Sequence, residues 1–102
     1  MNAPALPRIS VVVTCYNCRD YIAEAIRSVA RQTVRDYECV IVDDCSTDGT
    51  AEVVRKWGKR ALVRLIRNAA NRGAGFSRNE GVRQSGGGFL FFLDADDVFF
   101  PT

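Results

Sequence analysis

Residues 37–57 read YECVIVDDCSTDGTAEVVRKW, a stretch that joins an apolar run, a polar cluster and a helical pattern. The run YECVIV over 37–42 is rich in β-branched residues without strict alternation, as in a strand buried on both faces. Acids, hydroxyls and a glycine follow over 43–49, a composition typical of a loop and a helix cap. Apolar residues then recur at helical spacing, so we predict a helix over 50–57.

The alternation of strand and helix extends to both sides of this stretch. Strands are predicted at 9–14, 37–42, 62–66 and 89–93, and helices at 21–30, 50–57 and 76–83. Asn17 is placed to cap the first of these helices. Because alternating strands and helices form βαβ units, we expect an α/β fold with a mostly parallel sheet of about four strands flanked by helices, in the order βαβαβαβ.

Length, charge and hydropathy exclude several classes of protein. The 102 residues suit one small domain, and the net charge of +2 comes from scattered basic residues, so no nucleic-acid partner is expected. No apolar run approaches the ~20 residues of a membrane span, and no secretory signal pattern is present. The sequence therefore predicts a cytoplasmic domain.

Cysteines occur at four positions, and two of them, Cys15 and Cys18, form a CxxC pair. Such a pair serves in redox sites and as half of a zinc site. The chain has no histidine, and Cys39 and Cys45 do not form a second close pair. We interpret all four as free thiols in a reducing compartment, with a redox CxxC protein as an alternative.

Conspicuous polar clusters follow the predicted strands. In open parallel sheets, ligands bind beyond the carboxyl ends of the strands, and those ends meet at one edge. The clusters that would gather there are TCYN at 14–17, DDCS at 43–46, NRG at 71–73 and DADD at 94–97. Helix caps alone would not need so many acids, so we expect a binding site at this edge.

Each cluster offers a different contact to a nucleotide. The ring of Tyr16 could stack on a base, or pack as a half-buried tyrosine. Asp44 could accept a hydrogen bond from a ring N–H of the base, or cap the loop together with Asp43. Arg72 and Arg78 could meet phosphate, since guanidinium forks fit it well.

The acidic cluster at 94–97 has the pattern Asp-x-Asp-Asp. Mg²⁺ and Mn²⁺ take carboxylate oxygens and commonly bridge them to substrate phosphates. A bound cation would also compensate the charges of acids that otherwise repel one another. For an isolated Asp-x-Asp pattern, a solvated turn or helix N-cap is the simpler explanation. With the base and phosphate contacts, Asp94 and Asp96 complete the pattern of a nucleoside-diphosphate site.

A dinucleotide-binding site is the alternative to a nucleoside-diphosphate site, and it rests on Gly73 and Gly75. Gly73-Ala-Gly75 resembles the start of a dinucleotide fingerprint, and Asp94 lies at about the right distance to hold a ribose. The third small residue of that fingerprint would fall at Arg78, which counts against it. No GxxxxGK[ST] is present, so a P-loop is excluded.

The chain resembles the first part of a family 2 glycosyltransferase with the GT-A fold. The stretches that carry the resemblance are ISVVVTCYN (9–17), AIRSVARQT (25–33), VIVDDCSTDGT (40–50), NRGAGFSRNEG (71–81) and FLFFLDADDVFFP (89–101). They occur in order over nearly the whole chain. The resemblance implies that 1–102 form the Rossmann-like, donor-binding part of a glycosyltransferase domain, truncated before its acceptor half.

The resemblance also implies roles for residues at the strand ends. Thr14 and Tyr16 match positions that contact the nucleotide base, and Asp44, beside Asp43, matches the residue that hydrogen-bonds it. Cys45 stands where glycine is usual in the family.

Positions further along the chain match the phosphate and metal contacts of the family. Arg78 matches a basic position near the base and phosphates. Asp94 matches the acid near the ribose and metal, and Asp96 the direct ligand of Mn²⁺ or Mg²⁺. Family members place the general base beyond the position of Thr102.

The implied reaction is inverting transfer of a sugar from a nucleotide-diphospho-sugar, with a UDP-sugar favoured, to a hydroxyl of an acceptor sugar or lipid-linked glycan. The 102 residues alone would bind the donor and transfer little, and the full-length protein could work at the cytoplasmic face of the membrane. A non-catalytic nucleotide-binding module or an inactive relic is the alternative. Residues 89–93 and 98–100 carry large apolar side chains, so self-association through this segment is expected.

Overall fold

The computed structural model describes residues 9–31, 37–57, 63–86 and 88–94 of the chain. Its elements in chain order are β1 (Ile9–Cys15), α1 (Arg19–Ala30), β2 (Tyr37–Asp43), α2 (Thr50–Trp57), β3 (Val63–Arg67), α3 (Ala74–Gln84) and β4 (Phe89–Asp94). The predicted α/β order is therefore confirmed, and α2 has the predicted bounds. Asp96 and the apolar residues at 98–100 lie outside the described residues, so predictions about them stay predictions.

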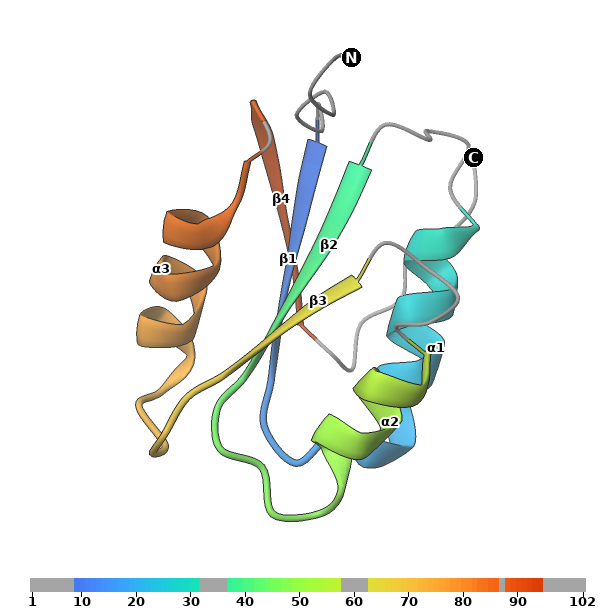
Figure 1. Cartoon of the computed structure of the whole chain (residues 1–102), viewed down its shortest axis with the longest axis vertical. Helices are drawn as coiled ribbons and strands as arrows, with labels where there is room; N and C mark the ends of the chain where they lie inside the picture. Colours follow the sequence, from blue (N-terminus) through green and yellow to red (C-terminus); the bar gives the residue numbers. More distant parts are fainter. Residues whose placement is uncertain (1–8, 32–36, 58–62, 87, 95–102) are drawn as a thin grey trace, which may run out of the picture.

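The four strands form one parallel sheet in the order β3-β2-β1-β4 (Figure 1). Val13 of β1 is in register with Ile41 of β2 on one side and with Leu93 of β4 on the other. The chain runs outward from β1 to β3 and then returns to the opposite side of β1. This reversal of strand order lies between β1 and β4, the position where sheets of this kind bind ligands.

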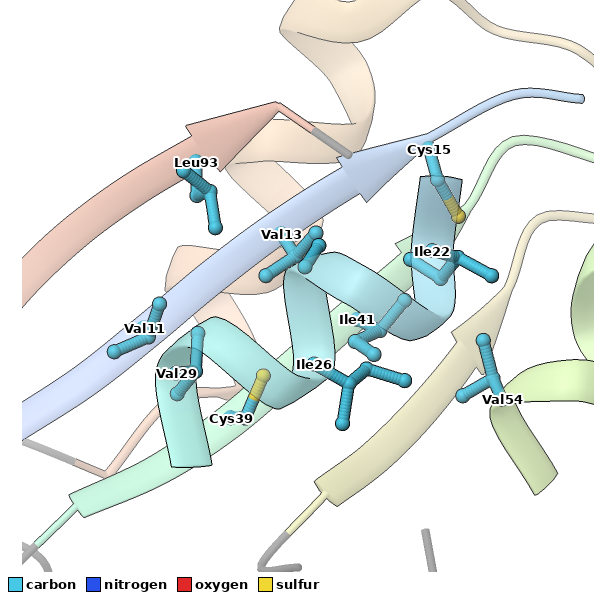
Figure 2. Close-up of a cluster of buried hydrophobic side chains, with 11 residues drawn as sticks. Val11, Val13, Cys15, Ile22, Ile26, Val29, Cys39, Ile41, Val54 and Leu93 are labelled. Carbon is cyan, nitrogen blue, oxygen red and sulfur yellow. The ribbon is translucent and has the colours of Figure 1, made fainter. Parts of the chain in front are cut away.

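One face of the sheet is covered by α1 and α2, and here the main apolar core lies (Figure 2). Val13 and Ile41 of the strands pack against Ile22 and Ile26 of α1, and Val54 of α2 joins the same cluster. These residues follow a period of two in the strands and a helical period in α1, which brings their side chains to one layer. This core fixes the carboxyl ends of β1 and β2 relative to the starts of both helices.

The other face of the sheet is covered by α3, which lies on the opposite side from α1 and α2 in Figure 1. Gly81 makes this packing close: a Cβ atom there would overlap Cγ1 of Val12 and lie 3.3 Å from Cγ2 of Val42. Ser77, one turn earlier, is fully buried. The close approach brings the first half of α3 to the strand ends, where its polar residues meet the loops.

No helix in the described part of the chain is long and apolar enough to cross a membrane.

Candidate functional site

The loops that follow β1 and β2 are joined by hydrogen bonds into one platform at the carboxyl edge of the sheet. The N–H of Asp44 donates to the carbonyl oxygen of Cys15 at 2.9 Å. The N–H of Asn17 donates to Oγ of Ser46 at 2.9 Å, and the N–H of Thr47 donates to Oδ1 of Asn17 at 2.8 Å. Each loop satisfies polar groups of the other, which fixes the residues between them.

Asp48 connects the same platform to both helices of that face. Its Oδ2 accepts the N–H of Arg19 at 3.1 Å, and its Oδ1 accepts the N–H of Thr50 at 3.0 Å. The prediction that Asn17 caps α1 is wrong. The N-cap residue is Cys18, whose side chain makes no capping hydrogen bond, and the side-chain oxygen Oδ1 of Asn17 accepts the N–H of Thr47 in the neighbouring loop instead. One acid from the second loop supplies the cap instead.

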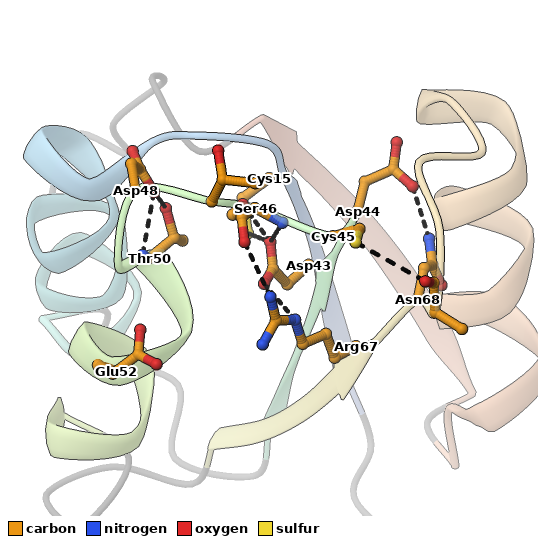
Figure 3. Close-up of polar contacts among 12 residues, drawn as sticks. Cys15, Asp43, Asp44, Cys45, Ser46, Asp48, Thr50, Glu52, Arg67 and Asn68 are labelled. Atoms are coloured by element: carbon orange, nitrogen blue, oxygen red, sulfur yellow. Dashed lines mark hydrogen bonds and ion pairs between the residues drawn. The ribbon is translucent and has the colours of Figure 1, made fainter.

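Asp43 supports the second loop from inside the molecule (Figure 3). Its side chain is fully buried, and Oδ1 accepts hydrogen bonds from the N–H and hydroxyl of Ser46. Its Oδ2 has no hydrogen bond and faces Nε of Arg67 at 3.6 Å, while Nη2 of Arg67 donates to the Ser46 carbonyl at 2.8 Å. In this arrangement the Asp43 carboxylate does not reach the surface, and it contacts the loop and Arg67.

Asp44 faces the other way, toward the loop before α3. Its Oδ1 accepts the N–H of Arg72 at 2.7 Å and Nδ2 of Asn68 at 2.9 Å, and its Oδ2 accepts the N–H of Gly73 at 2.8 Å. Nδ2 of Asn68 also donates to Oγ of Ser77 at 2.9 Å. The carboxylate is therefore tied to β3, to the α3 loop and to α3 itself.

These contacts determine the charge of Asp44. Burial alone would raise its pKa, but hydrogen bonds from the Arg72 N–H, the Asn68 amide, the Gly73 N–H and the Ser77 hydroxyl hold the pKa of Asp44 below its ordinary value. Each donor stabilises the ionised form. Asp44 is thus an anionic acceptor at neutral pH.

Tyr16 and Thr14 lie beside this acceptor, at the end of β1. Tyr16 directly follows Cys15, whose carbonyl oxygen pairs with Asp44, and its side chain is 48% exposed. Thr14 is half-buried and in register with Val42 on one side and with Asp94 of β4 on the other. The structure therefore brings the predicted aromatic residue, the predicted acceptor and the end of β4 to one edge of the sheet.

The two predicted cations extend from the start of α3. The guanidinium carbon of Arg72 lies 5.2 Å from the ring centre of Phe76, and that of Arg78 lies 5.8 Å from the ring centre of Phe92 in β4. Phe92 precedes Asp94, the last residue of β4, by two residues, so Arg78 lies beside the second half of β4. Both arginines are exposed and available to an anion.

Sequence reasoning missed Asn68 and Ser77, which were part of a loop and a helix without assigned roles. A usable signal existed, because Asn68 directly follows β3 and therefore lies at the same edge as the other polar clusters. Ser77 gave a weaker signal, since a single serine in a predicted helix does not by itself indicate a contact with a site.

The geometry counts against the two alternative sites. In the dinucleotide interpretation the N–H of Gly73 would face a pyrophosphate, but it is engaged by Asp44. All four cysteines are free, as predicted; Cys15 is buried, and its pKa is raised by burial and by the nearby Asp43. A redox nucleophile needs a lowered pKa.

Among the described residues, no group of three or more His, Cys, Asp or Glu could hold a metal ion.

The family of the chain follows from comparisons with known proteins. The family model described as glycosyl transferase family 2 matches residues 10–102. A glucosyltransferase of Escherichia coli, WfaP, named as using UDP-Glc and an α-D-GlcNAc-diphosphoundecaprenol, is 34% identical over 92% of this chain and 37% of its own length.

Among the solved structures that match the fold are two complexes with nucleotide-sugars. The crystal structure of Staphylococcus aureus TarS 1-349 with UDP-GlcNAc superposes with a TM-score of 0.85 at 37% identity, covering 89% of this chain and 27% of that one. The mannosyltransferase PcManGT of Pyrobaculum calidifontis, in complex with GDP-Man and Mn²⁺, superposes with a TM-score of 0.86 at 30% identity, covering 93% and 29%.

The chain spans only 16% to 37% of the length of the curated relatives it matches. Within that span, the described fold superposes on both solved structures with a TM-score of at least 0.85. The chain belongs to glycosyl transferase family 2 and has the nucleotide-binding architecture of the GT-A fold.

Proposed function

We propose that residues 1–102 form the donor-binding part of a glycosyltransferase that takes a sugar from a nucleotide-diphospho-sugar. The observation that carries the proposal is the ionised Asp44 carboxylate, fixed at the carboxyl edge of the sheet, where the N–H of Asp44 pairs with Cys15 and the exposed Tyr16 follows. An aromatic face and a fixed acceptor are the two contacts that hold a nucleobase. A UDP-sugar is the favoured donor, because the matched part of TarS was solved with UDP-GlcNAc and with UDP.

The roles of the remaining residues follow from their positions around that base. Tyr16 stacks on the base, Asp44 accepts its ring N–H, and Thr14 contacts the nucleoside at the end of β1. Arg72 and Arg78 neutralise the diphosphate. Asp43 would act through the loop that carries Asp44, because its buried carboxylate holds that loop.

A divalent cation, Mn²⁺ or Mg²⁺, is part of the proposal. The donor set fits a hard cation, because Asp94 and Asp96 carry carboxylates, and Asp94 is the last residue of the strand that pairs with the end of β1. PcManGT was solved with Mn²⁺, which supports this choice. When bound, the cation would stabilise the charge of the leaving diphosphate.

The transfer itself would invert the configuration of the sugar and use an acceptor hydroxyl activated by a base. We assign no residue among 1–102 as that base, so these residues alone should bind the donor and transfer little. The acceptor would be a sugar or a lipid-linked glycan, as the name of WfaP describes for that protein. Such an acceptor would bring the cytoplasmic enzyme to the inner face of the membrane.

Calorimetric titration of UDP, in Mn²⁺ and in EDTA, tests the donor site. We expect binding that Mn²⁺ strengthens, and we expect Asp96→Asn to remove the gain from Mn²⁺ without lowering the melting temperature. NAD serves as the comparison ligand and should bind more weakly than UDP. Tighter binding of NAD, or no binding of UDP with and without metal, would overturn the proposal in favour of a dinucleotide site or a relic.

A further inference from the structure

We infer that Asn68 is a positioning residue for the Asp44 carboxylate, and that this positioning makes the site select nucleobases with a ring N–H. The inference rests on the proposed donor site, in which Asp44 accepts a hydrogen bond from the base. Asn68 is only 8% exposed, and its side chain contacts Asp44 and Ser77. It would act through Asp44, without touching the nucleotide.

The amide of Asn68 has one usable orientation in this environment. Its Nδ2 donates to Oδ1 of Asp44 and to Oγ of Ser77, both at 2.9 Å, so both amide hydrogens are used. An ionised carboxylate can only accept, and therefore the NH₂ end must face Asp44. The main chain is fixed as well, because the N–H of Asn68 donates to the Asp43 carbonyl at 2.9 Å.

Ser77 anchors this amide to α3. It is fully buried, and α3 is held close to the sheet by Gly81 one turn later. The Asn68 amide therefore lies between a rigid helix and the carboxylate. Without it, the donors left to hold the Asp44 carboxylate would be the Ser77 hydroxyl and the N–H groups of Arg72 and Gly73, two neighbours in one loop.

The donors are divided unequally between the two carboxylate oxygens. Oδ1 accepts from Asn68 and Arg72, whereas Oδ2 accepts from Gly73. Each carboxylate oxygen has about two acceptor sites, so Oδ2 is the oxygen better able to accept a further donor. Figure 3 shows one oxygen directed at the Asn68 amide and the other pointing away from it.

A carboxylate fixed in this way discriminates between bases. Uracil and guanine present a ring N–H that Oδ2 can accept, whereas cytosine and adenine present an unprotonated ring nitrogen whose lone pair would face the anion. A site with a buried polar group rejects a ligand that leaves this group unpaired. The nucleotides in the matched structures, UDP-GlcNAc and GDP-Man, both carry a ring N–H.

The test compares the affinities of UDP and CDP for the wild type, Asn68→Ala and Ser77→Ala, all measured in Mg²⁺. We expect the wild type to prefer UDP by roughly 10- to 100-fold, the scale of one hydrogen bond to a charged group. Asn68→Ala should reduce this preference about tenfold, mainly through weaker binding of UDP. Ser77→Ala keeps the amide and should reduce the preference by a smaller factor. Gln84→Ala, which shortens an exposed amide at the far end of α3, should leave it unchanged.

A general structural role gives a different result. If Asn68→Ala weakens UDP and CDP by the same factor, or leaves the preference unchanged, the inference is wrong although the donor site stands. If the wild type binds neither nucleotide, the proposed function is wrong, and hydrogen exchange decides the positioning claim without a ligand. The amide hydrogen of Gly73 should then exchange about tenfold faster in Asn68→Ala than in the wild type, and equal rates would overturn the claim.

Discussion

The Oδ2 atom of Asp48, in the loop after β2, accepts the N–H of Arg19, the first residue of α1, at 3.1 Å. The Oδ1 atom of the same carboxylate accepts the N–H of Thr50, the first residue of α2. A single acid thus satisfies the free N–H groups at the starts of two helices. Because both helices cover the same face of the sheet, this acid also fixes the spacing of the two loops that carry Tyr16 and Asp44.

Asp48→Ala should lower the free energy of unfolding by about 1–3 kcal/mol, the sum expected for the loss of two caps. Urea denaturation measures this change. Glu52→Ala is the matched control, because Glu52 lies in the first turn of α2 and its ion pair with Arg55, at 3.7 Å, is exposed. That control should cost less than about 0.5 kcal/mol. Equal losses in the two variants would show that Asp48 is an ordinary surface acid.

The loss of stability in Asp48→Ala should depend on pH. Hydrogen bonds from the Thr50 hydroxyl and the Arg19 N–H outweigh burial and lower the pKa of Asp48 in the folded state. The stabilisation is therefore complete above the unfolded pKa of about 3.9 and is lost as the pH falls through the lower folded pKa. The difference between wild type and Asp48→Ala should be constant from pH 7 to about 5 and shrink below about pH 4. A difference that grows on acidification would contradict this assignment.

Gly81→Ala should destabilise the fold by about 1–3 kcal/mol, because the added methyl group would overlap the side chain of Val12 and overpack the α3 face. Gly75→Ala, in the same helix, meets open space and removes a flexible glycine, so it should be neutral or stabilise by up to about 1 kcal/mol. Thermal unfolding of both variants checks the pair. A Gly81→Ala protein as stable as Gly75→Ala would mean that α3 does not pack closely on β1 and β2.

Cys45→Gly should stabilise the protein by about 0.5–1 kcal/mol. Cys45 adopts a left-handed backbone conformation with φ of 64°, which costs a residue with a side chain about 1 kcal/mol and costs glycine almost nothing. Cys45→Ala is the control, since it removes the same thiol and keeps the Cβ atom. A gain in both variants would assign the effect to the thiol, and a gain in neither would mean that the loop relaxes this conformation.

The exposed apolar side chains of β4 should make the 102-residue chain self-associate. Phe89 is 64% exposed and Phe91 is 51% exposed, and β4 is the outer strand of the described sheet, paired with β1 on one side. Edge strands with exposed apolar side chains pair readily with other strands. Sedimentation should show a concentration-dependent dimer that Phe91→Lys dissociates, whereas Tyr21→Lys, at an exposed apolar site on α1, should not. A wild-type chain that stays monomeric up to high concentration would refute the prediction.

The strands and helices were predictable because their signals are local. The helix over 50–57 has the predicted bounds, since Gly49 and the acids before it mark the start and an amphipathic pattern marks the length. The start of α3 was placed two residues too late, at Phe76, because Ala74 and Gly75 were assigned to a glycine-bearing loop. A helix whose inner face is formed by Ser77 and Gly81 carries little hydrophobic signal.

The site was predictable as a position on the sheet but not as a set of contacts. The sequence indicated that Asp43 and Asp44 lie at the strand ends and favoured Asp44 as the base acceptor, but it did not indicate the contacts that hold either carboxylate. Successive residues at the end of a strand point to opposite faces, so Asp43 turns toward the α1 side and Arg67, and Asp44 turns toward α3. Such an outcome depends on partners far apart in the sequence, and Asn68 escaped notice for the same reason.

The most direct test of the account is the site at which UDP binds, mapped by the amide chemical shifts of the ¹⁵N-labelled protein in Mg²⁺. The account predicts that UDP shifts the amides of Tyr16, Asp44, Arg72 and Gly73, which surround the fixed carboxylate, and leaves those of Glu38 and Gly86 at the opposite edge of the sheet unchanged. Tyr16→Ala should weaken this binding by about 1–3 kcal/mol, the scale of one aromatic–base stack. Shifts centred on Glu38 and Gly86, or no shifts at millimolar UDP, would contradict the claim that this edge is a donor site.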